Sequence, residues 1–147
     1  MTIELVEENR RQYMDLLLIA DEQEDMIERY LDLGDMFILY DKVLVGECVI
    51  IEKEVGIFEL KNIAIYERFR GRGYGKKLIN YLFDYYQGRG KTMYVGTGDS
   101  PLSLPFYHRC GFKESHRIAN FFVDHYDHPI IEDGKQLIDM VYLKRDF

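Results

Sequence analysis

The chain has 147 residues, of which 47% are hydrophobic, so we expect one compact domain over residues 1–147 with a core of useful size. Its formal net charge of −7 disfavours a nucleic-acid partner, which needs a broad basic surface, and favours a neutral or cationic small substrate. The longest aliphatic run, Leu16 to Ala20, is too short to cross a bilayer and no signal peptide is evident, so we expect a cytoplasmic protein without a membrane partner.

The N-terminal third predicts one strand and two helices. Residues 2–6 form a strand-like run, and apolar residues at helical spacing predict a helix over residues 9–20. A second helix is predicted over residues 22–33, with Asp21 as its N-cap and Gly34 as its end. The segment from 21 to 35 holds seven acidic residues, which form either a solvated helix face or a rim that attracts an amine.

The middle and end of the chain predict mostly strands. Residues 36–40, 46–54 and 57–65 are strand-like and separated by short breaks, which favours an antiparallel meander. An amphipathic helix is predicted from about Gly75 to Gly88. A strand over residues 93–95, a short helix from about Ser103 and a final strand over residues 137–143 follow. This pattern predicts a single α+β domain.

The segment "ERFRGRGYGKKL", residues 67–78, joins a strand to this helix and combines glycines with basic side chains. Glycines allow the backbone to approach a ligand closely, and the N-terminus of a helix attracts anions. Flanking arginines add charge-assisted contacts to phosphate oxygens. The segment therefore predicts a diphosphate site, and the alternative is a flexible basic turn with no ligand.

Two nucleotide-binding motifs do not fit this loop. A Walker A motif needs glycine where Arg70 stands and a hydroxyl where Lys77 stands. A dinucleotide G-x-G-x-x-G motif fails because Lys76 or Leu78 occupies the position of its third glycine.

Arg70-x-x-Gly73-x-Gly75, between a strand and an amphipathic helix, resembles the pyrophosphate loop of the GCN5-related N-acetyltransferase (GNAT) superfamily. "FYHRCGF", residues 106–112, resembles the second signature segment of the same superfamily. The resemblance covers most of the chain. It implies a mixed, mostly antiparallel twisted sheet of about six to seven strands, flanked by about four helices, with a splay between the fourth and fifth strands.

The resemblance also implies acetyl-CoA as the acyl donor, and we expect no metal. The pyrophosphate would lie on the loop, and the backbones of Ile63 and Ile65 would pair with the pantetheine arm. Ser100 stands where many relatives have an asparagine that contacts this arm, and its reach is shorter. The loop residues expected to bind the cofactor are Arg70, Gly71, Arg72, Gly73, Tyr74, Gly75 and Lys76.

Two residues are expected to move protons while an amine attacks the thioester. Glu59 lies eleven positions before Arg70, the spacing of the general base in several relatives. Simple strand alternation places Glu59 and Asn62 on different faces of their strand. Partial burial would raise its pKa, whereas pairing with a cross-strand lysine is the alternative. The resemblance makes Tyr107 the general acid for the leaving thiolate, and packing with Phe106 and Phe112 is its alternative.

The segment "NFFVDHYDHP", residues 120–129, has histidines and aspartates, but their close spacing favours surface polar groups over a metal site. Its aromatic and acidic side chains could hold an ammonium group or simply pack in the core. Cys48 and Cys110 suggest neither a disulfide framework nor a zinc site. The resemblance implies an N-acetyltransferase acting on a primary amine of a small molecule or peptide. The alternative is a non-catalytic acyl-CoA-binding module. The sequence does not decide between a monomer and a homodimer.

Overall fold

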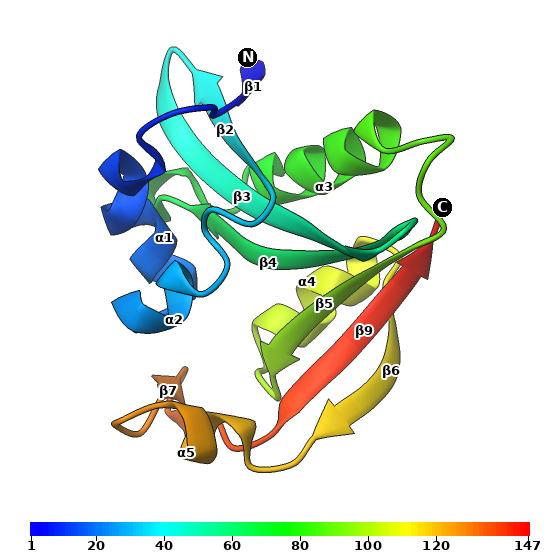
Figure 1. Cartoon of the computed structure of the whole chain (residues 1–147). Helices are drawn as coiled ribbons and strands as arrows, with labels where there is room; N and C mark the ends of the chain where they lie inside the picture. The colour runs from blue at the N-terminus through cyan, green and yellow to red at the C-terminus, as the bar shows by residue number, and fades with distance from the viewer. The chain divides into compact units, whose positions relative to one another are not determined.

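A computed structural model describes residues 1–147. The chain forms two compact units, Met1–Gly90 and Lys91–Phe147. Figure 1 shows strands and helices in both. Each unit combines an antiparallel sheet with helices, which confirms the α+β class.

The first unit contains a four-stranded antiparallel sheet in the order β1-β2-β3-β4. β4 has the bounds that the sequence predicts, and β2 and β3 each extend beyond theirs. The strands are β1 (Thr2–Leu5), β2 (Asp35–Asp41), β3 (Val43–Glu54) and β4 (Ile57–Ile65).

Helices α1 and α2 cover one face of this sheet. The predicted helix over residues 9–20 is a 3-10 turn, η1 (Arg10–Tyr13), followed by α1 (Met14–Ala20). Leu17, Ile27 and Leu31 pack with Met36 and Val49 of the sheet in one buried cluster. Burial of these apolar side chains is the main force that fixes both helices on this face.

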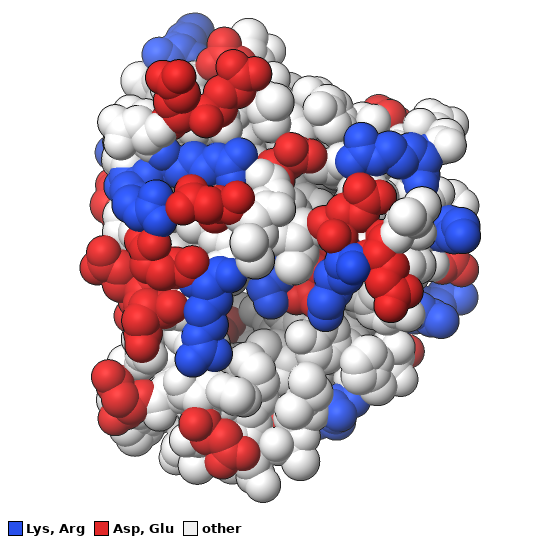
Figure 2. Space-filling view, in the orientation of Figure 1, with Lys and Arg blue, Asp and Glu red and all other residues white.

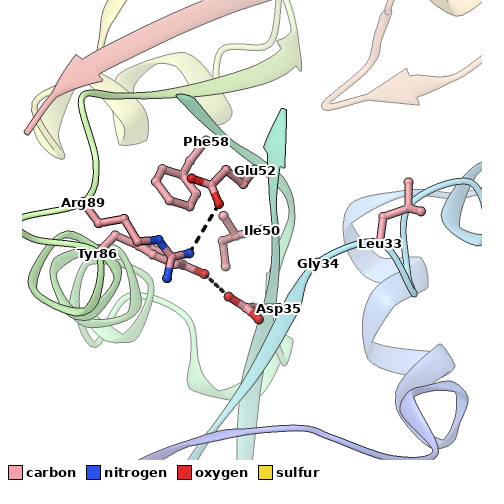
Figure 3. Close-up of a pocket in the computed structure, with 8 residues that line it drawn as sticks. All are labelled: Leu33, Gly34, Asp35, Ile50, Glu52, Phe58, Tyr86 and Arg89. Carbon is pink, nitrogen blue, oxygen red and sulfur yellow. Dashed lines mark hydrogen bonds and ion pairs between the residues drawn. The ribbon is translucent and has the colours of Figure 1, made fainter. Parts of the chain in front are cut away.

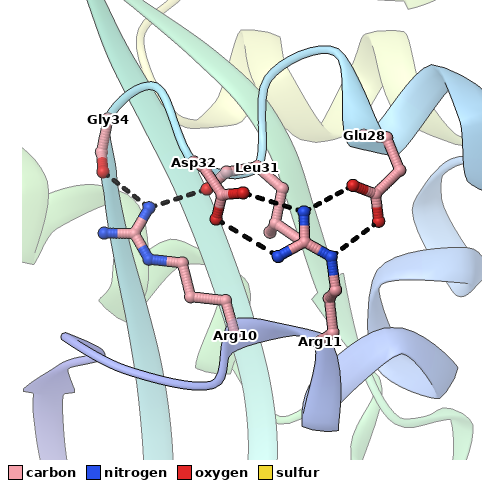
Figure 4. A network of polar contacts seen from close by, with 6 residues as sticks. All are labelled: Arg10, Arg11, Glu28, Leu31, Asp32 and Gly34. Atoms are coloured by element: carbon pink, nitrogen blue, oxygen red, sulfur yellow. Dashed lines mark hydrogen bonds and ion pairs between the residues drawn. The ribbon is translucent and has the colours of Figure 1, made fainter.

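The prediction of a second helix over residues 22–33 is wrong in length, because α2 comprises only Glu24–Glu28. Turns follow, and the Arg10 guanidinium donates hydrogen bonds of 2.7 Å to the carbonyls of Leu31 and Gly34. Figure 4 shows that these carbonyls point to a side chain of η1. A long-range contact thus supplies a donor to two backbone carbonyls in the turns after α2.

Helix α3 (Tyr74–Tyr85) follows a second 3-10 turn, η2 (Glu67–Phe69), and packs on the opposite face of the sheet. The rings of Tyr81 and Tyr85 meet Phe37 of β2 edge to face. Met36 lies in the buried cluster with α1 and α2. Because side chains alternate along a strand, its neighbour Phe37 points to the other face of the sheet. The sheet is therefore covered on both faces.

The second unit contains a three-stranded antiparallel sheet in the order β5-β9-β6. β6, α5 and the short β7–β8 hairpin are absent from the predicted elements. The helix near Ser103 is found despite Pro105, which the first turn of a helix tolerates. The elements are β5 (Thr92–Gly98), α4 (Ser103–Arg109), β6 (Lys113–Ile118), α5 (Phe121–His125), β7 (Ile131–Glu132), β8 (Lys135–Gln136) and β9 (Met140–Asp146).

The two sheets together have seven strands and the chain has five α-helices, close to the predicted six to seven strands and four helices. None of these helices combines the length and apolar character that crossing a membrane requires. The splay between the fourth and fifth strands, β4 and β5, stays a prediction.

Candidate functional site

The glycine loop forms a turn between η2 and α3. Gly71 and Gly73 have left-handed backbone angles, with φ of 77° and 82°. A Cβ at either position would meet no heavy atom within 4 Å, so the space beside both residues is open. Glycine adopts this conformation at low cost, and its missing side chain leaves room for a ligand against the backbone.

Aromatic rings and a backbone carbonyl hold the basic side chains of this loop. Arg70 donates from Nε to the carbonyl of Ile65, at 3.3 Å, at the end of β4. The guanidinium groups of Arg68 and Arg72 lie 4.8 and 5.6 Å from the centre of the Phe69 ring. Cation–π contacts of this kind keep positive charge near the turn.

The start of α3 fits a diphosphate. Gly73 is the N-cap residue and supplies no side-chain cap, and the first backbone bond runs from the Lys77 amide to the Gly73 carbonyl. The amides at the start of a helix have no intrahelical acceptor and attract anions. The open cradle at Gly71 and Gly73 and the arginines around it have the shape and charge that the pyrophosphate of acetyl-CoA requires.

A β-bulge in β4 changes which side chains share a face. Val49 of β3 pairs with Asn62, and the next β3 residue pairs with Leu60, so Lys61 is the extra residue. Ile51 pairs with Glu59, and since Val49 and Ile51 point the same way, Glu59 and Asn62 do too. The expectation that Glu59 and Asn62 lie on different faces of the strand is therefore wrong.

Glu59 is 2% exposed and pairs with two lysines on this face. Its carboxylate oxygens lie 2.9 Å from Lys53 Nζ and 2.7 Å from Lys61 Nζ. Burial raises the pKa of Glu59, but Lys61 and Lys53 lower it by more, so the pKa lies below its usual value. The expected raised pKa is wrong, and pairing with lysine, the alternative, is found.

In the second unit, Ser100 caps α4 and is almost fully buried. Its Oγ accepts from the amides of Leu102 and Ser103 and donates to Glu132 Oε1 at 2.6 Å. A hydroxyl has one proton, so Ser100 cannot donate to a cofactor arm while it bonds to Glu132. No pattern in the sequence indicates Glu132, because it lies 32 residues from Ser100 and in an unpredicted hairpin.

Tyr107 lies on α4, whose first turn Ser100 caps, and is 8% exposed. Its ring meets Phe106 and Phe112 edge to face, with centroid distances of 5.2 and 5.9 Å. Packing with Phe106 and Phe112, the alternative to a role as general acid, is therefore present. This packing fixes the position of the ring.

The aromatic segment after β6 is largely a small core. Phe122 clusters with Ile130 and Leu137, and Tyr126 stacks on Phe122 with a centroid distance of 5.5 Å. Core packing therefore explains Phe122. No group of three or more His, Cys, Asp or Glu side chains in the chain is arranged to hold a metal ion.

A pocket of about 320 Å³ lies in the first unit near the C-terminal end of α3 (Figure 3). The Tyr86 hydroxyl donates to Asp35 at 2.7 Å, and Arg89 lies 3.6 Å from Glu52. The glycine loop lies at the other end of α3, a helix about 18 Å long. This pocket is therefore separate from the anion cradle.

Acidic and basic side chains are interleaved on the face of the molecule that Figure 2 shows. Arg11 of η1, for example, pairs with Glu28 at the end of α2 and with Asp32 in the turns that follow it. Such mixed charge differs from the broad basic surface of a nucleic-acid binder.

The model of the acetyltransferase (GNAT) family matches residues 3–112, which include the glycine loop, β4 and α4. The chain belongs to the GNAT family of acetyltransferases. An uncharacterized N-acetyltransferase of Bacillus subtilis, YvbK, is 35% identical and covers 99% of this chain and 96% of its own length. This family membership confirms the resemblance that the two signature segments indicate.

Solved structures of GNAT proteins share the fold over the whole chain. A Bacillus subtilis acetyltransferase in complex with CoA has 34% identity and a TM-score of 0.88, covering 99% of this chain and 97% of its own. A GNAT acetyltransferase from Elizabethkingia anophelis with acetyl-CoA bound has 31% identity and a TM-score of 0.92, with the same coverage. The predicted GNAT fold is confirmed, and relatives bind the predicted cofactor.

Proposed function

We propose that this acetyltransferase transfers the acetyl group of acetyl-CoA to a primary amine of a small molecule or peptide. The observation that carries the proposal is the open, positively charged cradle at Gly71 and Gly73, at the uncapped start of α3. Family membership supplies the reaction class, and the family model spans parts of both units, which supports one functional domain over residues 1–147.

The loop residues would hold the donor. The amides from Arg70 to Gly75 and the side chains of Arg70, Arg72 and Lys76 would bind the pyrophosphate, and the backbones of Ile63 and Ile65 would bind the pantetheine arm. When bound, acetyl-CoA supplies a thioester carbonyl that a neutral amine can attack.

Two side chains of this protein would move the protons. Glu59 is ionised at neutral pH because its pKa is lowered, so it can accept the proton of the attacking amine directly or through water. The Tyr107 hydroxyl would donate a proton to the thiolate of CoA as it leaves. Packing against Phe106 and Phe112 would hold that hydroxyl in place.

The acceptor is proposed to be a cationic amine. The chain is acidic overall, and the connection from α1 to α2 together with the first turn of α2 carries Asp21, Glu22, Glu24 and Asp25. A negative field raises the local concentration of ammonium compounds. A cytoplasmic location fits this proposal, which needs no metal, nucleic acid or membrane and leaves a homodimer open.

A thiol-release assay with a panel of primary amines tests the proposal. Tyr107→Phe should lower kcat by about 100-fold and leave acetyl-CoA affinity unchanged, because it removes one proton donor. Tyr94→Phe on β5 is the matched control and should keep full activity. Tight acetyl-CoA binding without turnover on any amine would contradict the proposal and favour a non-catalytic module.

A further inference from the structure

Glu47 of β3 is a carboxyl group that the proposed reaction does not use. It has no exposed surface, and neither of its oxygens has a hydrogen-bond partner. An isolated buried carboxylate is so costly that such groups are normally paired or hold a proton. The two lysines on this face of the sheet, Lys53 and Lys61, pair with Glu59 instead.

A second buried acceptor without a partner lies beside Glu47. Asn62 is 3% exposed, and its Oδ1 has no hydrogen-bond partner. Glu47 pairs with Ala64 and Val49 pairs with Asn62, so Glu47 and Asn62 are diagonal neighbours on one face of β3 and β4. The orientation of the Asn62 amide is fixed, since its Nδ2 donates to the Leu17 carbonyl, an acceptor only.

One proton would satisfy both groups. A carboxylate and an amide oxygen are both acceptors and cannot bond to each other, whereas a protonated carboxyl has a hydroxyl that can donate. Burial also raises the pKa of Glu47 well above its usual value, and the nearby Ala64 backbone, which makes no hydrogen bond of normal geometry to the carboxyl, lowers it by less.

We propose that Glu47 is a neutral hydrogen-bond donor to Asn62, and that this pair positions the connection between α1 and α2. The Asn62 Nδ2 donates at 3.0 Å to both the Leu17 carbonyl of α1 and the Tyr30 hydroxyl after α2. Tyr30 in turn donates to Asp21 at 3.3 Å. Asn62 therefore holds this connection from both sides.

The inference deepens the proposed function, on which its catalytic consequence rests. The connection and the first turn of α2 carry the acidic residues proposed to attract the acceptor amine, so Glu47 is a positioning residue for acceptor binding. Ionisation of Glu47 would remove the donor to Asn62 and loosen the connection. The titratable groups that interact with Glu47 are Tyr30 and Cys48. Asp21 and Lys61 contact Tyr30, Glu59 pairs with Lys61, and Tyr13 packs against the same cluster.

Infrared spectroscopy of the unmodified protein tests the protonation directly. At pH 7 we expect the carbonyl band of a protonated carboxylic acid, which shifts in heavy water and is absent in Glu47→Gln. The control Glu54→Gln, an exposed residue at the end of the same strand, should keep the band. A spectrum without this band at pH 7 would overturn the proposal, whatever the enzyme acetylates.

Two variants test the positioning role. Glu47→Gln keeps a donor for Asn62, so the KM for the acceptor should stay within about twofold, whereas Glu47→Met lacks a donor and should raise it about tenfold. Acetyl-CoA affinity should not change in either. If Glu47→Gln is as impaired as Glu47→Met, Glu47 acts as a carboxylate, for example as a ligand for the ammonium of the acceptor.

Stability against pH gives a readout that needs no activity. As pH rises past about 4.3, the carboxyl ionises in the unfolded chain before it does in the folded protein, so its raised pKa lowers stability above that pH. Glu47→Gln should therefore raise the melting temperature at pH 8 and not at pH 4. An equal change at both values would contradict a proton held by Glu47, and this test stands even if Glu47→Met fails to fold.

Discussion

Single residues decide how the loop before α3 can bind an anion. Gly73 ends the turn with a φ of 82° and opens the helix without a side-chain cap. A side chain in this conformation costs about 1–2 kcal/mol, and its Cβ would also stand where a ligand approaches the backbone. The backbone strain and the loss of space for a ligand can be separated, because Gly88 has the same left-handed conformation outside the loop.

Gly73→Ala should weaken acetyl-CoA binding by at least about tenfold, measured by titration calorimetry, because strain and lost space act together. Gly88→Ala is the matched control, since Gly88 also has a positive φ, of 86°, and open space around it, but follows the C-terminal end of α3. The control should lose stability and keep its affinity. Equal affinities for the two variants would remove the loop from donor binding.

Glu59→Gln should lower kcat by about 100-fold, because the variant removes the proposed proton acceptor. Since the pKa of Glu59 lies below its usual value, the carboxylate is ionised from pH 6 to 9 and the loss should be uniform over this range. Steady-state rates across this range measure it. A rate equal to that of the unmodified protein would mean that another group or bulk water accepts the proton.

At the scale of elements, contacts between distant segments set where helices end. The two arginines of η1 hold residues 28–34, the end of α2 and the turns after it, in different ways (Figure 4). Arg10 donates to two backbone carbonyls, and the exposed Arg11 pairs with the carboxylates of Glu28 and Asp32. Removing the donor of a buried or half-buried carbonyl lowers stability more than breaking an exposed ion pair does.

Arg10→Ala should therefore lower the free energy of unfolding by about 1–3 kcal/mol, because two carbonyls lose their donor. Arg11→Ala should change it little, because water and salt screen an exposed pair. Urea denaturation of both variants measures the difference. A larger loss in Arg11→Ala would show that the carboxylate pairs, and not the carbonyl contacts, hold this segment.

At the scale of the whole molecule, donor binding should couple to stability. A ligand that binds only the folded protein stabilises it by about 2.7 kcal/mol at a hundred times its Kd. For a chain of this size, that corresponds to a rise in melting temperature of about 5–10 °C. Thermal denaturation with acetyl-CoA should show this rise. The pantetheine fragment, which lacks the pyrophosphate, should give much less, and an equal rise with both would contradict the role of the loop.

The sequence alone determined the family and predicted the donor site. The Arg70-to-Gly75 motif and the 106–112 segment are short, and their spacing and glycine content follow from local backbone requirements. Strand β4 and helix α3 were predicted well for the same reason, because periodic apolar residues encode them locally.

Only the tertiary structure decided the electrostatics of the carboxyl groups and several boundaries. The bulge at Lys61 brings Glu59 and Asn62 to one face, and the paired lysines lower the pKa of Glu59. Glu47 lies in a strand with nothing in its sequence to mark it, yet it is fully buried without a partner. Burial, pairing and the contact of Ser100 with Glu132 depend on residues distant in sequence, so local patterns do not encode them.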